Sequence, residues 1–335
     1  MILIRRYFWL SFITLCFISC STDLELEAEW KDVPVVYGFL ATTDTAHYLR
    51  VEKAFLEPGG DALTIARNPD SIYYDEDVMV QLVRLSNSQT FSLSRVDGAL
   101  EGYPREEGIF ATQPNYLYKI KADVLRLQEK ERIQLRIDRG GETTPVTAET
   151  SILEKITLSN SSPPINVNWD YTRQVTFRWR TGANTKLFDL RLIINIEESL
   201  PGKPNELQDR SLVWILTDEL ENTEGSSQIS FSVLGDSFYK FLAVELEEED
   251  GVIRRFKNIE VQVIGAGVEL LAFNRINLAN TGITSSQVVP LYTNLSEGRG
   301  IFSSRTVATR KGLNISSLTR DSLRDGSFTE HLNFQ

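Results

Sequence analysis

Alternation of apolar and polar residues recurs at short intervals along this chain, and it is the feature that most restricts the fold. The longest case is residues 188–196, FDLRLIINI, in which every second residue is apolar and Ile193 is the exception at the positions between. Successive side chains of a strand point to opposite faces, so a period of two indicates strands with one buried face. Further strand-like segments, some alternating and some mostly apolar or β-branched, cover residues 33–40, 47–55, 77–85, 90–96, 115–122, 132–137 and 144–152, then 175–180, 211–216, 228–233 and 259–263. The pattern predicts a mainly β protein of antiparallel sandwiches.

The chain length and a linker-like segment predict how these strands are divided into domains. A chain of 335 residues is long enough for two domains, and SNSSPP at residues 159–164 is typical of a linker. We therefore expect two immunoglobulin- or fibronectin-like sandwiches in tandem. They are expected at residues 33–158 and 164–310, with a loop at 200–209 and a polar tail at 311–335.

One segment breaks the strand rhythm. Asp236 and Ser237 can cap a helix, and Phe238, Phe241 and Leu242 follow at helical spacing. We expect one short helix at residues 237–246, in the second domain. The alternative is a strand that pairs with residues 252–256.

The N-terminus has the organisation of a secretory signal. Arg5 and Arg6 precede an apolar run at residues 7–18, which is too short for a transmembrane helix of about 20 residues. The run ends at Ser19-Cys20, which resembles a bacterial lipobox, although Phe17 stands where leucine is usual. A lipobox implies cleavage before Cys20 and acylation of Cys20 with palmitate-type chains, which anchor the protein to a lipid bilayer. The alternative is a plain signal peptide that is cleaved elsewhere.

The segment after the signal, the net charge and the cysteines restrict the kinds of partner and site that this chain can have. Residues 21–32 are polar and acidic and are expected to form a tether. The net charge is −11, which argues against nucleic acid, because phosphate binding depends on clustered Lys and Arg. Two cysteines are present, Cys16 and Cys20, so the processed chain could form neither an internal disulfide nor a thiolate metal site.

Groups for catalysis or metal binding are sparse. The histidines are His47, expected to be half-exposed on a strand, and His331 in the polar tail. Neither belongs to a nucleophilic triad pattern. The acidic run at residues 75–77 lacks the spacing of a calcium loop. We therefore expect no metal, no cofactor and no enzymatic activity.

Aromatic and hydroxyl residues supply the remaining candidates. Trp169, Trp179 and Trp214 could stack on a ligand, but alternating tryptophans in a sandwich are more often core residues. Three tripeptides, DTA at 44–46, DSI at 70–72 and DSL at 321–323, resemble the O-glycosylation sequon of Bacteroidota. They make Thr45, Ser71 and Ser322 candidate glycosylation sites, with the first two in turns or loops.

The segment PLYTNLSEGRGIFSSR at residues 290–305 is the most specific motif. It resembles the closing motif N-[IL]-x-x-G-x-G-[IY]-F of an uncharacterised family of Bacteroidota outer-membrane lipoproteins, matched here by Asn294, Gly298, Gly300 and Phe302. The resemblance implies two β-rich domains, a gene often placed beside a TonB-dependent receptor, and no established catalytic residue. The glycines fit a tight turn that needs backbone freedom, and Phe302 is expected to be buried.

These features together predict a lipoprotein of the outer membrane, facing either the periplasm or the outside. It would act as a binding or accessory module, with a TonB-dependent transporter as the partner that the resemblance implies. Two alternatives remain open: a cell-surface hydrolase of polysaccharide or peptide, and a purely structural envelope protein.

Overall fold

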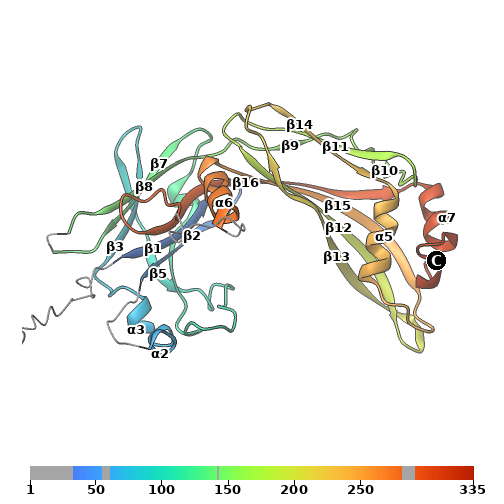
Figure 1. Cartoon of the computed structure of the whole chain (residues 1–335), viewed down its shortest axis with the longest axis horizontal. Coiled ribbons are helices and arrows are strands. Elements are labelled where there is room, and N and C mark those ends of the chain that lie inside the picture. The colour runs from blue at the N-terminus through green and yellow to red at the C-terminus, as the bar shows by residue number, and fades with distance from the viewer. Residues whose placement is uncertain (1–32, 55–60, 142, 281–290) are drawn as a thin grey trace, which may run out of the picture.

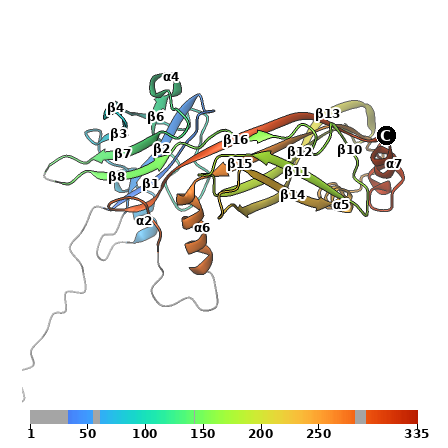
Figure 2. The same cartoon turned by 90° about the horizontal axis from the view of Figure 1, so that it is seen from above.

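The computed structural model of the chain describes residues 33–54, 61–141, 143–280 and 291–335. The expected signal peptide (1–20) with its candidate lipid anchor Cys20, and the expected tether (21–32), lie outside the described residues. Two β-rich halves lie end to end along the long axis, as Figure 1 shows from one side and Figure 2 from above. The chain is mainly β and forms two β-sandwiches in tandem, as the alternation predicted.

The first sandwich packs two sheets around one core. One sheet contains β1 (Pro34–Leu40), β2 (Ala46–Lys53), β6 (Tyr116–Lys121) and β5 (Ser94–Asp97), and the other contains β4 (Gln89–Ser92), β3 (Met79–Arg84), β7 (Arg132–Asp138) and β8 (Val146–Ser151). Leu49 from one sheet and Leu82 and Leu135 from the other are fully buried in the shared core. The connections contain short helices α2 (Ala62–Ala66), α3 (Pro69–Ile72) and α4 (Ala122–Leu125).

The second sandwich is built in the same way. One sheet contains β13 (Lys203–Glu221), β12 (Leu187–Leu200), β15 (Arg254–Ala266) and part of β16 (Arg299–Ile315), and the other contains β14 (Gln228–Leu234), β11 (Gln174–Arg180) and β9 (Thr157–Leu158). The predicted short helix is confirmed as α5 (Asp236–Glu245), which buries Phe238 and Leu242. The ring of Trp169 stacks on that of Phe238 at 4.8 Å, and Trp169 and Trp179 are almost fully buried. These two tryptophans are therefore core residues.

Strand β16 belongs to both sandwiches. Its first part, Arg299 to Ser304, pairs in parallel with β1, whereas Arg305 to Leu313 pairs antiparallel with β15. Strand β10 (Asn166–Val167) also pairs with β16 in parallel. The division at residues 159–164 into two consecutive domains therefore needs correction, because the chain returns to the first sandwich before it ends in the second. Pairing between segments so distant in sequence leaves no local pattern.

The hairpin of β12 and β13 is longer than predicted. Residues 203–209, expected in a loop, are part of β13, and the chain reverses at Pro201 and Gly202. Gly202 has φ +71, which glycine adopts without steric cost. A proline and polar residues are tolerated in β13 because it lies at the edge of its sheet.

The C-terminal segment is folded, so its description as a polar tail was wrong. It contains helix α7 (Ser317–Asp325) and the 3₁₀ helix η2 (Glu330–Leu332). Ser316 caps α7 by accepting a hydrogen bond from the Thr319 backbone at 3.1 Å. Sparse apolar residues of this segment, Leu323, Leu332 and Phe334, are buried in the second core. Helix α6 (Val268–Asn280), which follows β15, was also not predicted.

Candidate functional site

Two hydrogen bonds within the closing motif link Asn294 to Phe302 of β16. The Asn294 side chain donates to the carbonyl of Phe302 at 2.6 Å and accepts from its amide at 2.9 Å. A side-chain amide thus satisfies the backbone of β16 as a neighbouring strand would. Phe302 itself is fully buried in the first core.

The two glycines of the motif let β16 approach β1 closely. Gly298 has φ +113 and Gly300 has φ +98. A Cβ on Gly300 would lie 2.0 Å from the Val36 carbonyl oxygen, and one on Gly298 would lie 2.4 Å from that of Pro34. Both positions therefore require glycine for conformation and for space. The motif therefore allows β16 to pair with β1, and Tyr37 and Phe39 of β1 line a groove.

A groove of about 600 Å³ lies on the outward face of β1 and β2. We name it the tyrosine groove. Its walls combine aromatic and charged side chains with a few small residues: Tyr37, Gly38, Phe39, Asp44, Thr45, Ala46, Tyr48, Arg50, Glu101, Tyr103, Leu117 and Arg305. Tyr37 and Tyr103 remain 43% and 54% exposed. Exposed aromatic rings beside charged groups are typical of ligand sites.

Alternation along the strands brings these side chains together. Val36 and Leu40 of β1 face the core, which turns Tyr37 and Phe39 outward. Tyr37 lies opposite Arg50 in the antiparallel pair of β1 and β2.

A network of polar contacts fixes the groove. The Tyr48 hydroxyl donates to Glu101 at 2.9 Å, and the Lys119 ammonium lies 2.5 Å from the same carboxylate oxygen. These contacts, first from Lys119 and then from Tyr48, hold the pKa of Glu101 below its usual value. The Tyr48 and Tyr103 rings are 4.9 Å apart. The groove is therefore preorganised, with Glu101 ionised at neutral pH.

Two arginines of the groove are also held by carboxylates. Arg50 contacts Glu52 at 2.9 Å through one guanidinium nitrogen, and Arg305 contacts both oxygens of Asp44 at 3.1 Å. Arg305 follows the part of β16 that pairs with β1. Its contact with Asp44 ties the β1–β2 turn to the strand that both sandwiches share.

The candidate glycosylation residues have different environments. Thr45 is exposed at the groove. Ser71 was expected in a loop but lies half-buried in α3, which begins because Asn68 caps it and Pro69 occupies its first turn. Ser322 lies half-buried in α7. The structure does not bring the three residues together, and whether they are modified stays a prediction.

His47 is buried, and the expectation of a half-exposed residue was wrong. It lies on the inward face of β2 with Leu49 and Val51 and is 1% exposed. Its Nδ1 has no hydrogen-bond partner among the described residues. Burial lowers the pKa of His47, an effect that Asp44 opposes and Arg305 reinforces. In the described part of the chain, no group of three or more potential metal ligands occurs.

His47→Leu should weaken the pH dependence of stability between about pH 7.5 and 5.5. The unfolded chain takes up a proton near pH 6.5, whereas the folded chain resists it because its pKa is lowered. Stability is therefore present above the unfolded pKa and falls as the pH drops below it. The slope of the unfolding free energy against pH should fall by the equivalent of up to about one bound proton. Urea unfolding at several pH values measures this slope. His331→Gln is the control, since His331 is exposed; an unchanged slope in His47→Leu would contradict the assignment.

Sequence reasoning did not single out the tyrosine groove. The available signal was the aromatic residues at the outward positions of a strand, Tyr37 and Phe39, beside apolar inward ones. The loop that supplies Glu101 and Tyr103 carries no local pattern that would place it against β2.

Comparisons with known proteins give little additional information. The chain matches no family model, and no curated protein is significantly similar to it. Among solved structures, one similar chain is titled "Crystal structure of DIP-gamma IG1+IG2", with 10% identity, a TM-score of 0.18, and coverage of 83% of this chain and 95% of that one. At that TM-score the likeness carries no argument, and the fold class rests on the strands and sheets themselves.

Of the helices in the described ranges, none is long and apolar enough to cross a bilayer.

Proposed function

We propose that this protein is an outer-membrane lipoprotein that acts as a binding or accessory module beside a TonB-dependent transporter, with the tyrosine groove as its contact site. The observation that carries the proposal is the groove itself, where exposed aromatic rings lie beside charges fixed by hydrogen bonds. The lipobox-like Ser19-Cys20 supports the anchor. The resemblance of residues 290–305 supports the choice of transporter.

Chain length keeps the groove near the proposed anchor. Pro34, the first residue of β1, is the fourteenth residue after Cys20. Fourteen residues span at most about 50 Å when fully extended. The first sandwich is therefore within reach of a membrane partner.

The charge state of Glu101 argues against its acting as the proton donor of a glycosidase at this groove. A glycosidase needs one carboxyl whose pKa is raised, so that it can donate a proton. The pKa of Glu101 is lowered instead, by Lys119 and Tyr48. Glu101 is thus suited to accept hydrogen bonds from a bound ligand or partner.

The test combines the anchor with the groove in the native host. Wild-type protein should incorporate an alkyne fatty acid and co-purify with a TonB-dependent receptor from detergent-solubilised membranes. Cys20→Ala should abolish the label and release the protein. The double variant Tyr37→Ala/Tyr103→Ala should keep the label and lose most of the receptor, because it removes two exposed contact rings.

Val244→Ala serves as the matched control, since Val244 is 81% exposed on α5, in the second sandwich. It should leave both readouts unchanged. An unlabelled wild-type protein would refute the anchor, and unchanged receptor recovery in the tyrosine double variant would refute the role of the groove.

A further inference from the structure

A second cavity lies on the outward face of the three-stranded sheet in the second sandwich. It has a volume of about 500 Å³, and Leu158, Trp179 and Ile229 contribute to its lining beside the polar residues. We name the outward polar side chains that line this cavity the arginine face. They are Thr157 of β9, Ser159 directly after β9, Arg178 and Arg180 of β11, and Gln228 and Ser230 of β14. Phe177 and Trp179, between and beside the arginines, face the core. The two arginines therefore point away from the core by strand alternation.

Strand register arranges the arginine face as a row of cations between two rows of neutral polar groups. Arg180 lies opposite Gln228 on one side and Thr157 on the other, and Arg178 lies opposite Ser230. Residues i and i+2 of a strand, such as Arg178 and Arg180, are about 7 Å apart. A ligand lying along β11 would thus meet two guanidinium groups in succession and hydroxyl or amide groups beside each.

The charge at this place is not neutralised. Among the described residues, no carboxylate lines this cavity or the adjoining one of about 350 Å³, which shares Thr157 and contains Lys155 and Arg310. Arg178 donates to the neutral hydroxyl of Ser162 at 3.3 Å. By contrast, the arginines of the tyrosine groove are held by carboxylates. A net charge of −11 makes such a local excess of cations unusual in this chain.

We propose that the arginine face binds an acidic oligosaccharide through its carboxylate or sulfate groups. Guanidinium groups match the geometry of such oxyanions. The Ser, Thr and Gln side chains can exchange hydrogen bonds with sugar hydroxyls. This site goes beyond the proposed transporter contact and lies on the other sandwich.

Two other polyanions fit less well. A membrane surface is usually bound by cations together with large apolar side chains that insert into the lipid. Among the described outward positions of β14 and β11, the one large apolar residue is Leu234. It pairs with Gln174, at the opposite end of β14 from Gln228. Nucleic acid requires a larger cationic footprint or aromatic stacking, and the chain as a whole is acidic.

The test is calorimetric titration of the full-length protein with oligogalacturonate, with a sulfated chondroitin oligosaccharide and with neutral maltohexaose. At least one acidic sugar should bind, and maltohexaose should not. Arg178→Gln/Arg180→Gln should weaken binding about tenfold or more, since it removes two charge-assisted contacts. Both side chains are exposed, so the thermal unfolding midpoint should stay unchanged.

Arg255→Gln is the matched control, because Arg255 is an exposed arginine of the same sandwich on β15. It should leave the affinity within about twofold, whereas an equal loss would reduce the effect to net charge and overturn the proposal. Failure of both acidic sugars to bind would also overturn it. Tighter binding to phosphatidylglycerol vesicles than to either sugar would replace it with a membrane contact.

Discussion

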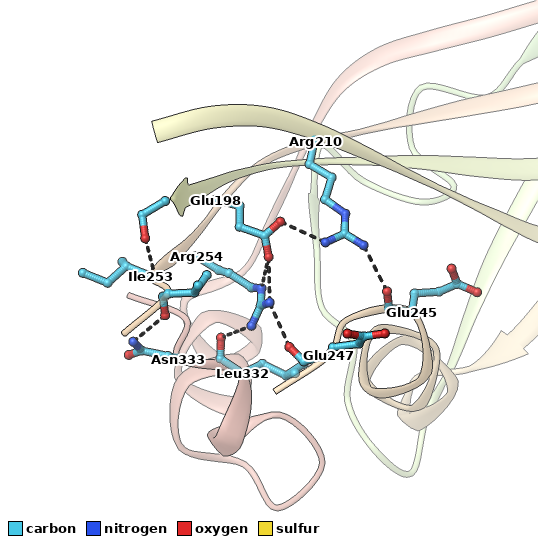
Figure 3. Close-up of polar contacts among 10 residues, drawn as sticks. Glu198, Arg210, Glu245, Glu247, Ile253, Arg254, Leu332 and Asn333 are labelled. Atoms are coloured by element: carbon cyan, nitrogen blue, oxygen red, sulfur yellow. Dashed lines mark hydrogen bonds and ion pairs between the residues drawn. The ribbon is translucent and has the colours of Figure 1, made fainter. Parts of the chain in front are cut away.

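Arg254→Ala should lower the free energy of unfolding of the second sandwich by about 3–5 kcal/mol, the cost expected when one partner of a buried ion pair is removed. Arg254 lies on β15 and is 1% exposed. Its guanidinium contacts the Glu198 carboxylate at 2.6 Å. It also donates to the carbonyls of Leu332 and Glu247, each at 2.9 Å. Figure 3 shows these contacts converging from three parts of the chain.

Each partner of Arg254 comes from a different element, which explains the size of the effect. Glu198 lies on β12, Glu247 follows α5, and Leu332 ends the 3₁₀ helix near the C-terminus. Burial has the largest single effect on the pKa of Glu198 and raises it. The hydrogen bonds from Arg210 and Arg254 and the charges of these two arginines together outweigh burial, so the pKa lies below its usual value. Removing Arg254 would leave a partly buried carboxylate with one cation fewer and two carbonyls unpaired.

Urea unfolding followed by tryptophan fluorescence suits this measurement. All tryptophans within the described residues, Trp169, Trp179 and Trp214, belong to the second sandwich or pack against its core, so their emission reports on it. Arg255→Ala, one residue along the strand but exposed, should change stability by less than about 0.5 kcal/mol. Equal losses in the two variants would show that the buried network is not the source of the stability.

The strands of both sandwiches could be predicted because their information is local. Residues 188–196 alternate except at Ile193, and β12 covers them with the expected inward face. Helix α5 was predictable because its apolar residues follow helical spacing after a capping segment. In each case the side chains that decide the structure are neighbours in sequence.

The missing parts depend on contacts between distant segments. Nothing near residues 299–304 indicates that they pair with β1 rather than with a neighbouring strand. Leu323, Leu332 and Phe334 are too widely spaced among polar residues to suggest burial, yet the second core covers them. The tyrosine groove was missed for the same reason, since Tyr37 and Glu101 meet through the fold.

Gly300→Ala should destabilise the first sandwich by about 3 kcal/mol or more. A non-glycine residue with positive φ costs about 1–2 kcal/mol, and Gly300 has φ +98. The added Cβ would also lie 2.0 Å from the Val36 carbonyl oxygen, so β16 and β1 would have to separate. Urea unfolding followed by far-UV circular dichroism should show the loss.

Gly312→Ala separates the two causes. Gly312 lies on the same strand with φ +75, but a Cβ there would meet no atom within 4 Å. It should therefore cost about 1 kcal/mol, from backbone strain alone. The difference between the two variants measures the close approach of β16 to β1, and equal losses would contradict it. Because β1 carries Tyr37 and Phe39, Gly300→Ala should also reduce receptor recovery at the tyrosine groove, whereas Gly312→Ala should not.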